Sequence, residues 1–153
     1  METTFVILKP GTIQRGLIGD VIRRFEKKGL QLVAMKMQQL TSEILTEHYS
    51  HLSSKPFFPT VLSSMMASPV ILCCWRGVDA VAVVRSLCGI TNARDAQPGT
   101  IRGDFGMSVQ ANIVHASDSK ESAEIEINRF FKPEELFDYQ PVSIHYLYAS
   151  DEM

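Results

Sequence analysis

A histidine, His115, stands at the boundary between an apolar segment and a polar one. Asn112-Ile113-Val114 precede it, and Ala116-Ser117-Asp118 follow it. An imidazole with a pKa of about 6.5 is mostly neutral at pH 7, so its free nitrogen can attack an electrophile without a separate base. Histidines at such boundaries are also common as structural residues. The position by itself leaves both interpretations open.

Three basic residues, Lys9, Arg85 and Arg102, lie at predicted element ends or in loops beside glycine or proline. Cations and free backbone N–H groups can converge on a phosphate at such places, although the same residues also fit a solvated surface. The formal net charge of −2 and the pI near 6.1 give no basic field for nucleic acid or an anionic membrane. Any phosphate site must therefore be local.

The 153 residues are 45% hydrophobic and 21% charged, which is the composition of an ordinary folded protein. No linker, internal repeat or charge block divides the chain, so we expect one domain over residues 1–153. Its three cysteines show no CxxC spacing, and the longest apolar stretch, Val70 to Trp75, is too short to cross a bilayer. We therefore expect no disulfide framework, no membrane span and a reducing compartment, most simply the cytoplasm.

Four segments have the pattern of β-strands. Thr4–Leu8 is apolar and ends at Lys9-Pro10-Gly11, and Leu30–Leu40 alternates apolar residues with polar or small ones. Val70–Trp75 is a continuous apolar run typical of a buried strand, and Ala111–His115 reads as a short strand. Two of these strands therefore end at the lysine and the histidine considered above.

Helical spacing of apolar residues predicts helices between the strands. The predicted helical segments are Ile18 to Phe25 with Gly29 as its stop, a helix from Thr41 or Ser42, Pro59–Met66, Val78–Cys88 with Gly89 as its stop, a helix opened by Asp118 and Glu121 as a capping box, and one turn at Pro133–Glu135. Gly89–Gly106 is predicted to be a long loop, and the residues after Glu135 a tail.

The resulting order, β-α-β-α-α-β-α-β-α, predicts an α+β fold. It reduces to a ferredoxin-like βαββαβ core with a four-stranded antiparallel sheet and additional helices. The same core underlies RNA-recognition modules, which need exposed aromatics and neighbouring cations on their central strands. The predicted strands carry Val, Ile, Leu, Met and Cys instead, so we expect no specific nucleic-acid partner.

Three motifs together resemble the nucleoside diphosphate kinase family, namely Thr4–Pro10, Pro98–Phe105 and Asn112–Ser119. Family-like spacing also holds at residues 15–19, 47–49, 56–58 and 121–126, so the resemblance runs from Thr4 to about Tyr139. It implies phosphoryl transfer in two half-reactions. In these, the histidine takes the γ-phosphoryl group of a nucleoside triphosphate and then gives it to a nucleoside diphosphate.

The resemblance also implies roles for the surrounding residues. Glu126 would hold one ring nitrogen so that Nδ1 faces the phosphate, and Ser117 would bond to Glu126. Phe57 and Val109 resemble an apolar clamp that holds the base without reading its edge, which implies broad base specificity. The catalytic group would be His115, Glu126, Ser117 and Lys9. The residues around the phosphates and ribose would be Lys9, Tyr49, Arg85, Thr91, Arg102 and Asn112.

The implied cofactor is Mg²⁺, bound through the nucleotide phosphates, because the chain has no recognisable protein cage for it. His48 and His51 have a spacing that could suggest zinc, but no further ligand spacing supports such a site. The implied partners are nucleoside di- and triphosphates and further copies of the chain. The expected assembly is a hexamer, with a tetramer as the alternative.

Three positions depart from the family pattern. Gly11-Thr12 stands in place of an Asp-Gly pair, Ala93 in place of a proline, and Ala116 in place of a glycine. The Cβ of Ala116 would strain the backbone if φ were positive there, and the loss of proline could weaken assembly. Every residue nominated for chemistry is present, so we expect an active enzyme. An inactive family member kept as a scaffold is the alternative.

Overall fold

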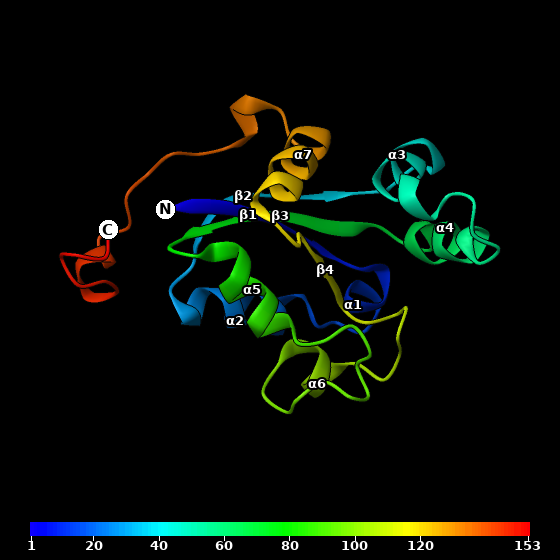
Figure 1. The fold of residues 1–153 in the computed structure, drawn as a ribbon, viewed down its shortest axis with the longest axis horizontal. Helices are drawn as coiled ribbons and strands as arrows, with labels where there is room; N and C mark the ends of the chain where they lie inside the picture. Colours follow the sequence, from blue (N-terminus) through cyan, green and yellow to red (C-terminus); the bar gives the residue numbers. More distant parts are fainter.

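The computed structural model describes residues 1–153 and has a four-stranded sheet at its centre (Figure 1). The strands are β1 (Glu2–Leu8), β2 (Gln31–Gln38), β3 (Val70–Gly77) and β4 (Val114–Ala116), in the spatial order β2-β3-β1-β4. All neighbouring pairs are antiparallel. The predicted α+β fold with a βαββαβ core and an antiparallel sheet is confirmed.

The sheet buries both of its faces, because alternate residues of a strand point to opposite sides. On β1, Val6 and Leu8 belong to one buried cluster, and Phe5 and Ile7 belong to the other. Helices cover each cluster (Figure 1). They are α2 (Ile18–Lys28) and α5 (Ala80–Cys88) on the first face, and α3 (Ser42–His48), α4 (Phe58–Met66) and α7 (Lys120–Phe130) on the second.

Local sequence signals set the ends of these helices. α2 stops at Gly29, which has a left-handed φ of 103° that a side chain would strain. α3 begins after Thr41, whose hydroxyl oxygen accepts a hydrogen bond from the Ile44 N–H. α5 runs up to Gly89, as predicted. These three boundaries therefore agree with the sequence predictions.

Two short helices occupy segments that the sequence predicted to be loops. α1 (Pro10–Gln14) begins directly after β1, because proline fits the first helical position, where no N–H partner is needed. α6 (Ile101–Phe105) interrupts the predicted loop and begins after Thr100, whose Oγ1 accepts from the Gly103 N–H at 3.0 Å. Both helices are too short to produce an apolar period that the sequence would reveal.

Three further boundaries differ from the predictions. β4 starts at Val114 rather than Ala111, because Ile113 has a positive φ of 77° that breaks the strand. α7 is capped by Ser119 rather than Asp118, since the Ser119 hydroxyl oxygen accepts from the Ser122 N–H at 3.0 Å. The predicted tail contains a 3₁₀ turn at Ile144–Tyr146, in addition to the expected turn at Pro133–Glu135.

Cys73, Cys74 and Cys88 are free thiols, and all three are buried. None of the helices is both long enough and apolar enough to pass through a lipid bilayer.

Candidate active site

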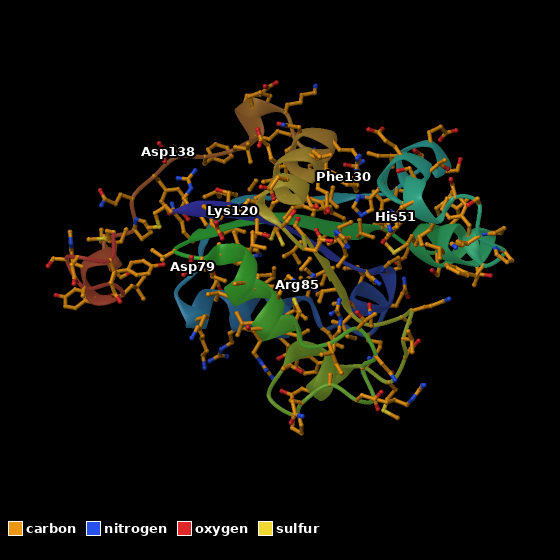
Figure 2. All side chains as sticks on the ribbon, viewed as in Figure 1. His51, Asp79, Arg85, Lys120, Phe130 and Asp138 are labelled. Carbon is orange, nitrogen blue, oxygen red and sulfur yellow. The ribbon has the colours of Figure 1, made fainter.

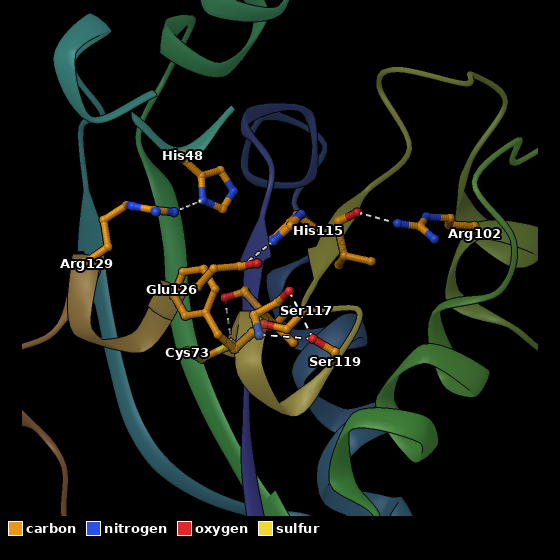
Figure 3. Close-up of polar contacts among 12 residues, drawn as sticks. His48, Cys73, Arg102, His115, Ser117, Ser119, Glu126 and Arg129 are labelled. Carbon is orange, nitrogen blue, oxygen red and sulfur yellow. Dashed lines mark hydrogen bonds and ion pairs between the residues drawn. The ribbon is translucent and has the colours of Figure 1, made fainter. Parts of the chain in front are cut away.

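His115 lies in the middle of β4, opposite Ile7 of β1. β4 is at the edge of the sheet, and the His115 side chain is 22% exposed. The chain then turns into α7, which packs back over β1 and brings Glu126 to the histidine (Figure 3). The strand and the helix that follows it therefore build the centre of the site.

Glu126 fixes the orientation of the imidazole. Its Oε2 lies 2.5 Å from His115 Nε2, and its side chain is only 11% exposed. A carboxylate can only accept hydrogen bonds, so Nε2 carries the proton and the lone pair of the neutral ring is on Nδ1. A hydrogen bond to a charged acceptor is stronger than one between neutral groups. The ring is therefore held in one tautomer.

Ser117 does not form the expected bond to Glu126. Its hydroxyl group is fully buried and donates to the Phe5 carbonyl at 3.4 Å. The Ser117 N–H donates to the same carbonyl at 3.1 Å, which extends the β1–β4 pairing by one residue. Both polar groups of Ser117 are therefore bonded to the backbone of β1 rather than to the carboxylate.

Lys9 follows β1 directly, and its ammonium group reaches the segment before β4. Nζ donates to Asn112 Oδ1 at 2.7 Å and to the Gln110 carbonyl at 3.1 Å, while the Asn112 amide donates to the Thr91 carbonyl at 2.9 Å. Burial, with the nearby charge of Arg102, lowers the pKa of Lys9 to about 8. The lysine is therefore still mostly a cation at pH 7.

Arg102 holds together the loops on one side of the site. Its guanidinium donates to the carbonyl groups of Gly89 at 2.7 Å, Val114 at 2.8 Å and Asn112 at 3.2 Å. Burial lowers the pKa of this guanidinium, but an arginine at neutral pH keeps its charge. Three of its five N–H groups are used in these bonds, so two remain for a ligand.

These groups line one cavity of about 530 Å³. The predicted site residues on its wall are Lys9, Tyr49, Arg85, Thr91, Arg102, Asn112, His115 and Glu126. Arg85 on α5 is exposed and has no hydrogen-bond or ion-pair partner, so its charge is available to an anion. Figure 2 shows Arg85 on α5 and His51 in the turn after α3, two elements remote in sequence that both contribute to this wall.

Phe57 and Val109, the predicted base clamp, do not line this cavity. Phe57 precedes α4 and is 43% exposed, and Val109 lies between α6 and β4 and is 44% exposed. Both are apolar side chains on the surface rather than part of the core. Their exposure leaves them available to a ligand.

Further wall residues were not assigned to the site from the sequence. They are His48, His51, Val114, Ala116, Asp118, Ser122, Ile125 and Arg129. Ser122 and Arg129 are four residues before and three residues after Glu126 on α7, so they share its helical face. That spacing is a signal in the sequence that could have identified them.

A second histidine, His48, lies against the first. The ring centroids are 4.7 Å apart, and the planes meet at 80°. His48 Nδ1 accepts from Arg129 Nη1 at 3.0 Å, so Nε2 carries the proton, and this buried N–H has no partner. Burial, followed by the charges of His115 and Arg129, lowers the pKa of His48 to about 2.

The potential ligand atoms of His48, His115 and Glu126 lie within 4.8 Å of one another. The bonding pattern does not suit a metal ion, however, because His115 Nε2 and Glu126 are bonded to each other. His48 offers no free lone pair, since its Nδ1 accepts from Arg129. These side chains therefore form a hydrogen-bonded network.

The only other carboxylate on the wall is Asp118, whose pKa is lowered chiefly by a hydrogen bond from Ser122.

Comparison with known proteins agrees with this geometry. The sequence profile described as nucleoside diphosphate kinase matches residues 2–136. The chain belongs to the nucleoside diphosphate kinase family. A nucleoside diphosphate kinase from Parabacteroides distasonis is 64% identical over 152 residues, which is 99% of each chain. Nucleoside diphosphate kinase B from Homo sapiens is 47% identical over 148 residues, 97% of each chain.

A solved structure of a nucleoside diphosphate kinase from Halobacterium salinarum in complex with CDP superposes with a TM-score of 0.94. It is 43% identical and covers 97% of this chain and 99% of its own. The predicted family and the predicted enzyme class, a phosphotransferase of the nucleoside diphosphate kinase type, are confirmed.

The positions that depart from the nucleoside diphosphate kinase pattern fit this backbone. Ala116 belongs to β4 and does not have a positive φ, so the expected strain is absent. Ala93 is 3% exposed and packs so closely on Gly106 that a Cβ at Gly106 would lie 2.5 Å from it. Gly11 is in α1 and has open space around it.

Proposed function

We propose that the chain transfers the γ-phosphoryl group of a nucleoside triphosphate to a nucleoside diphosphate through a phosphohistidine at His115. The observation that carries the proposal is the 2.5 Å contact between His115 Nε2 and Glu126 Oε2, which leaves the lone pair on Nδ1. The cavity beside this ring is lined by Lys9, Arg85 and Arg102. A nucleophile among cations suits attack on a phosphate.

In the first half-reaction, the Nδ1 lone pair forms a bond to the γ-phosphorus as the bond from that phosphorus to the β-phosphate oxygen breaks. The nucleoside diphosphate leaves with the electron pair. The Nε2 proton stays on the ring, and the carboxylate of Glu126 stabilises the positive charge that develops on the imidazole. The second half-reaction runs the same step in reverse, with a different nucleoside diphosphate as acceptor.

Positioning and charge stabilisation account for most of the catalysis of phosphoryl transfer. Asn112 holds the Lys9 ammonium group in place, Arg85 is free, and Arg102 keeps two N–H groups unused in its bonds to carbonyl groups. Tyr49, whose pKa is raised to about 12 chiefly by burial, remains a neutral hydroxyl donor. Thr91 completes the predicted ribose and phosphate contacts.

The predicted broad specificity fits two exposed apolar side chains, Phe57 and Val109, which can hold a base without reading its edge. Mg²⁺ would be held mainly by the phosphates of the nucleotide, with Asp118 as the carboxylate that can face it, and it would neutralise phosphate charge. The oxygen donors that Mg²⁺ prefers are few on the wall, which suits an ion that arrives with its nucleotide.

We further propose a homo-oligomer, most simply a hexamer with a tetramer as the alternative, in the cytoplasm. β2 is an edge strand with Met35 and Met37 exposed at 52% and 59%, and such an edge favours pairing with another chain. The three free, buried thiols suit a reducing compartment. Native mass spectrometry distinguishes the two assemblies, and a monomer would contradict both.

Radiolabel transfer tests the proposed mechanism. Incubation with γ-labelled ATP is expected to give an acid-labile, base-stable phosphoenzyme that is discharged by a second nucleoside diphosphate. His115→Asn should abolish the label. His145→Asn is a matched control, because His145 is exposed in the C-terminal 3₁₀ turn, far along the chain from the cavity residues. Label that survives His115→Asn would exclude this histidine as the nucleophile.

A further inference from the structure

The residue before β4, Ile113, is in a strained conformation. Its φ is 77°, a region that β-branched residues rarely adopt. The Val114 N–H donates to the Asn112 carbonyl at 2.9 Å and closes a three-residue turn around Ile113. Such a conformation persists only where the surrounding structure holds it, and it concentrates at functional sites.

This turn joins two groups of the active site. Asn112, its first residue, accepts a hydrogen bond from the ammonium group of Lys9, and His115 follows its last residue directly. Arg102 donates to the backbone carbonyls of the first and last residues of the turn, Asn112 and Val114. A change in the turn would therefore alter the distance between the proposed nucleophile and the cations.

Two hydrogen bonds hold the carbonyl group of Ile113 itself. One comes from the Lys9 N–H at 2.9 Å, and the other comes from the Thr12 hydroxyl at 2.6 Å. Thr12 is fully buried in α1, the helix that starts directly after Lys9. The Ile113 carbonyl oxygen therefore bonds the strained turn to the segment that carries Lys9.

We propose that Thr12 is a positioning residue of the active site. Its hydroxyl holds the Ile113 turn against α1 and so fixes Lys9 and Asn112 relative to His115. Thr12 does not line the 530 Å³ cavity, so it acts through these neighbours rather than on a ligand. This proposal depends on the proposed function in one respect, because it takes the cavity as the place where the phosphates bind.

Thr12→Val tests the hydroxyl, because valine keeps the shape of threonine and removes the donor. A matched control is Thr4→Val, since Thr4 is also fully buried but its Oγ1 has no hydrogen-bond partner. Thr12→Ser restores the hydroxyl. Thr12→Ala removes it without adding a methyl group, in case valine does not pack. Each variant is assayed as the full chain in its native assembly.

The measurements are the rate per phosphorylatable site, the affinity for ADP and the hydrogen exchange of the Lys9 and Val114 amides. Thr12→Val and Thr12→Ala should lower kcat/KM about five- to tenfold, as expected for the loss of one buried hydrogen bond. The fraction of sites that can be phosphorylated should stay unchanged. The two amides should exchange faster, while Thr12→Ser stays within about twofold of the parent.

Two outcomes would overturn the proposal. In the first, Thr12→Val matches Thr4→Val in rate, ADP affinity and amide exchange. In the second, the whole decrease in the rate of Thr12→Val comes from a smaller fraction of phosphorylatable sites, which would indicate a purely structural role. A wild-type chain without phosphohistidine would instead overturn the proposed mechanism. The ADP affinities and amide exchange rates would then still decide the role of Thr12.

Discussion

The two histidines of the cavity differ in the partner that each one has. His115 donates to a carboxylate, whereas His48, with its ring centroid 4.7 Å away, accepts from a guanidinium. The carboxylate leaves the lone pair of His115 on the nitrogen that remains free, and the guanidinium occupies the lone pair of His48. Two identical side chains in one cavity are therefore given opposite hydrogen-bonding states by the charge of the group behind each ring, one suited to the proposed nucleophile and the other to a neutral donor.

The largest effect is expected from neutralising the carboxylate. Glu126→Gln removes the charge that stabilises the developing imidazolium, so the rate of phosphoenzyme formation should fall on the order of a hundredfold. Affinity for ADP should change by less than about twofold. Rapid-quench phosphorylation measures the rate, and Glu124→Gln, an exposed carboxylate on the same helix, is the control. An unchanged rate would show that the partner of His115 does not set its role.

The second expected effect is on the pH dependence of stability. The pKa of His48 is about 2 in the folded chain and about 6.5 in the unfolded chain, so the unfolded chain binds more protons between these values. The free energy of unfolding should therefore decrease as pH falls below about 6.5, with up to about 1.4 kcal/mol per pH unit from this group.

His48→Gln removes the titrating ring and keeps an acceptor for Arg129. Urea unfolding between about pH 6 and pH 4 should give a shallower slope for this variant than for the parent. His145→Gln, which changes an exposed histidine, should leave the slope unaltered. If the free energy of unfolding of His48→Gln falls with pH as steeply as that of the parent, another group causes the acid sensitivity.

The smallest effect is expected from removing the guanidinium. Arg129→Met leaves the lone pair of His48 Nδ1 without its donor and should lower the free energy of unfolding by about 1 kcal/mol at pH 7. The exposed Arg23→Met should change it by less than about 0.5 kcal/mol. Equal stability of the two variants in urea would contradict a structural role for the Arg129–His48 pair.

The fold was largely predictable because its long elements carry clear periods. The continuous apolar runs of the first and third strands and the apolar spacing of α2 and α7 recur in the two buried clusters. What escaped prediction was short or set by distant contacts. α1 and α6 have five residues each, which is too few for a period, and the start of β4 depends on the strained turn at Ile113.

The site divides in the same way. The His115–Glu126 pair joins neighbouring elements and was implied by the family resemblance, whereas the Arg129–His48 pair spans 81 residues and was not. Ser117 was given the wrong partner because its environment depends on the backbone of β1, which local sequence does not reveal. The Thr12 hydrogen bond to Ile113 likewise spans 101 residues.

Arg102 holds the two ends of a long segment together and also lines the cavity. One guanidinium joins Gly89 to the residues flanking Ile113, and the same group lines the 530 Å³ cavity. A bound phosphate would hold this side chain in place and, with it, both ends of the intervening 20-odd residues. Free energy gained from a bound anion would thus protect that stretch from unfolding and proteolysis, and a protease that cleaves there would act more slowly on the loaded enzyme.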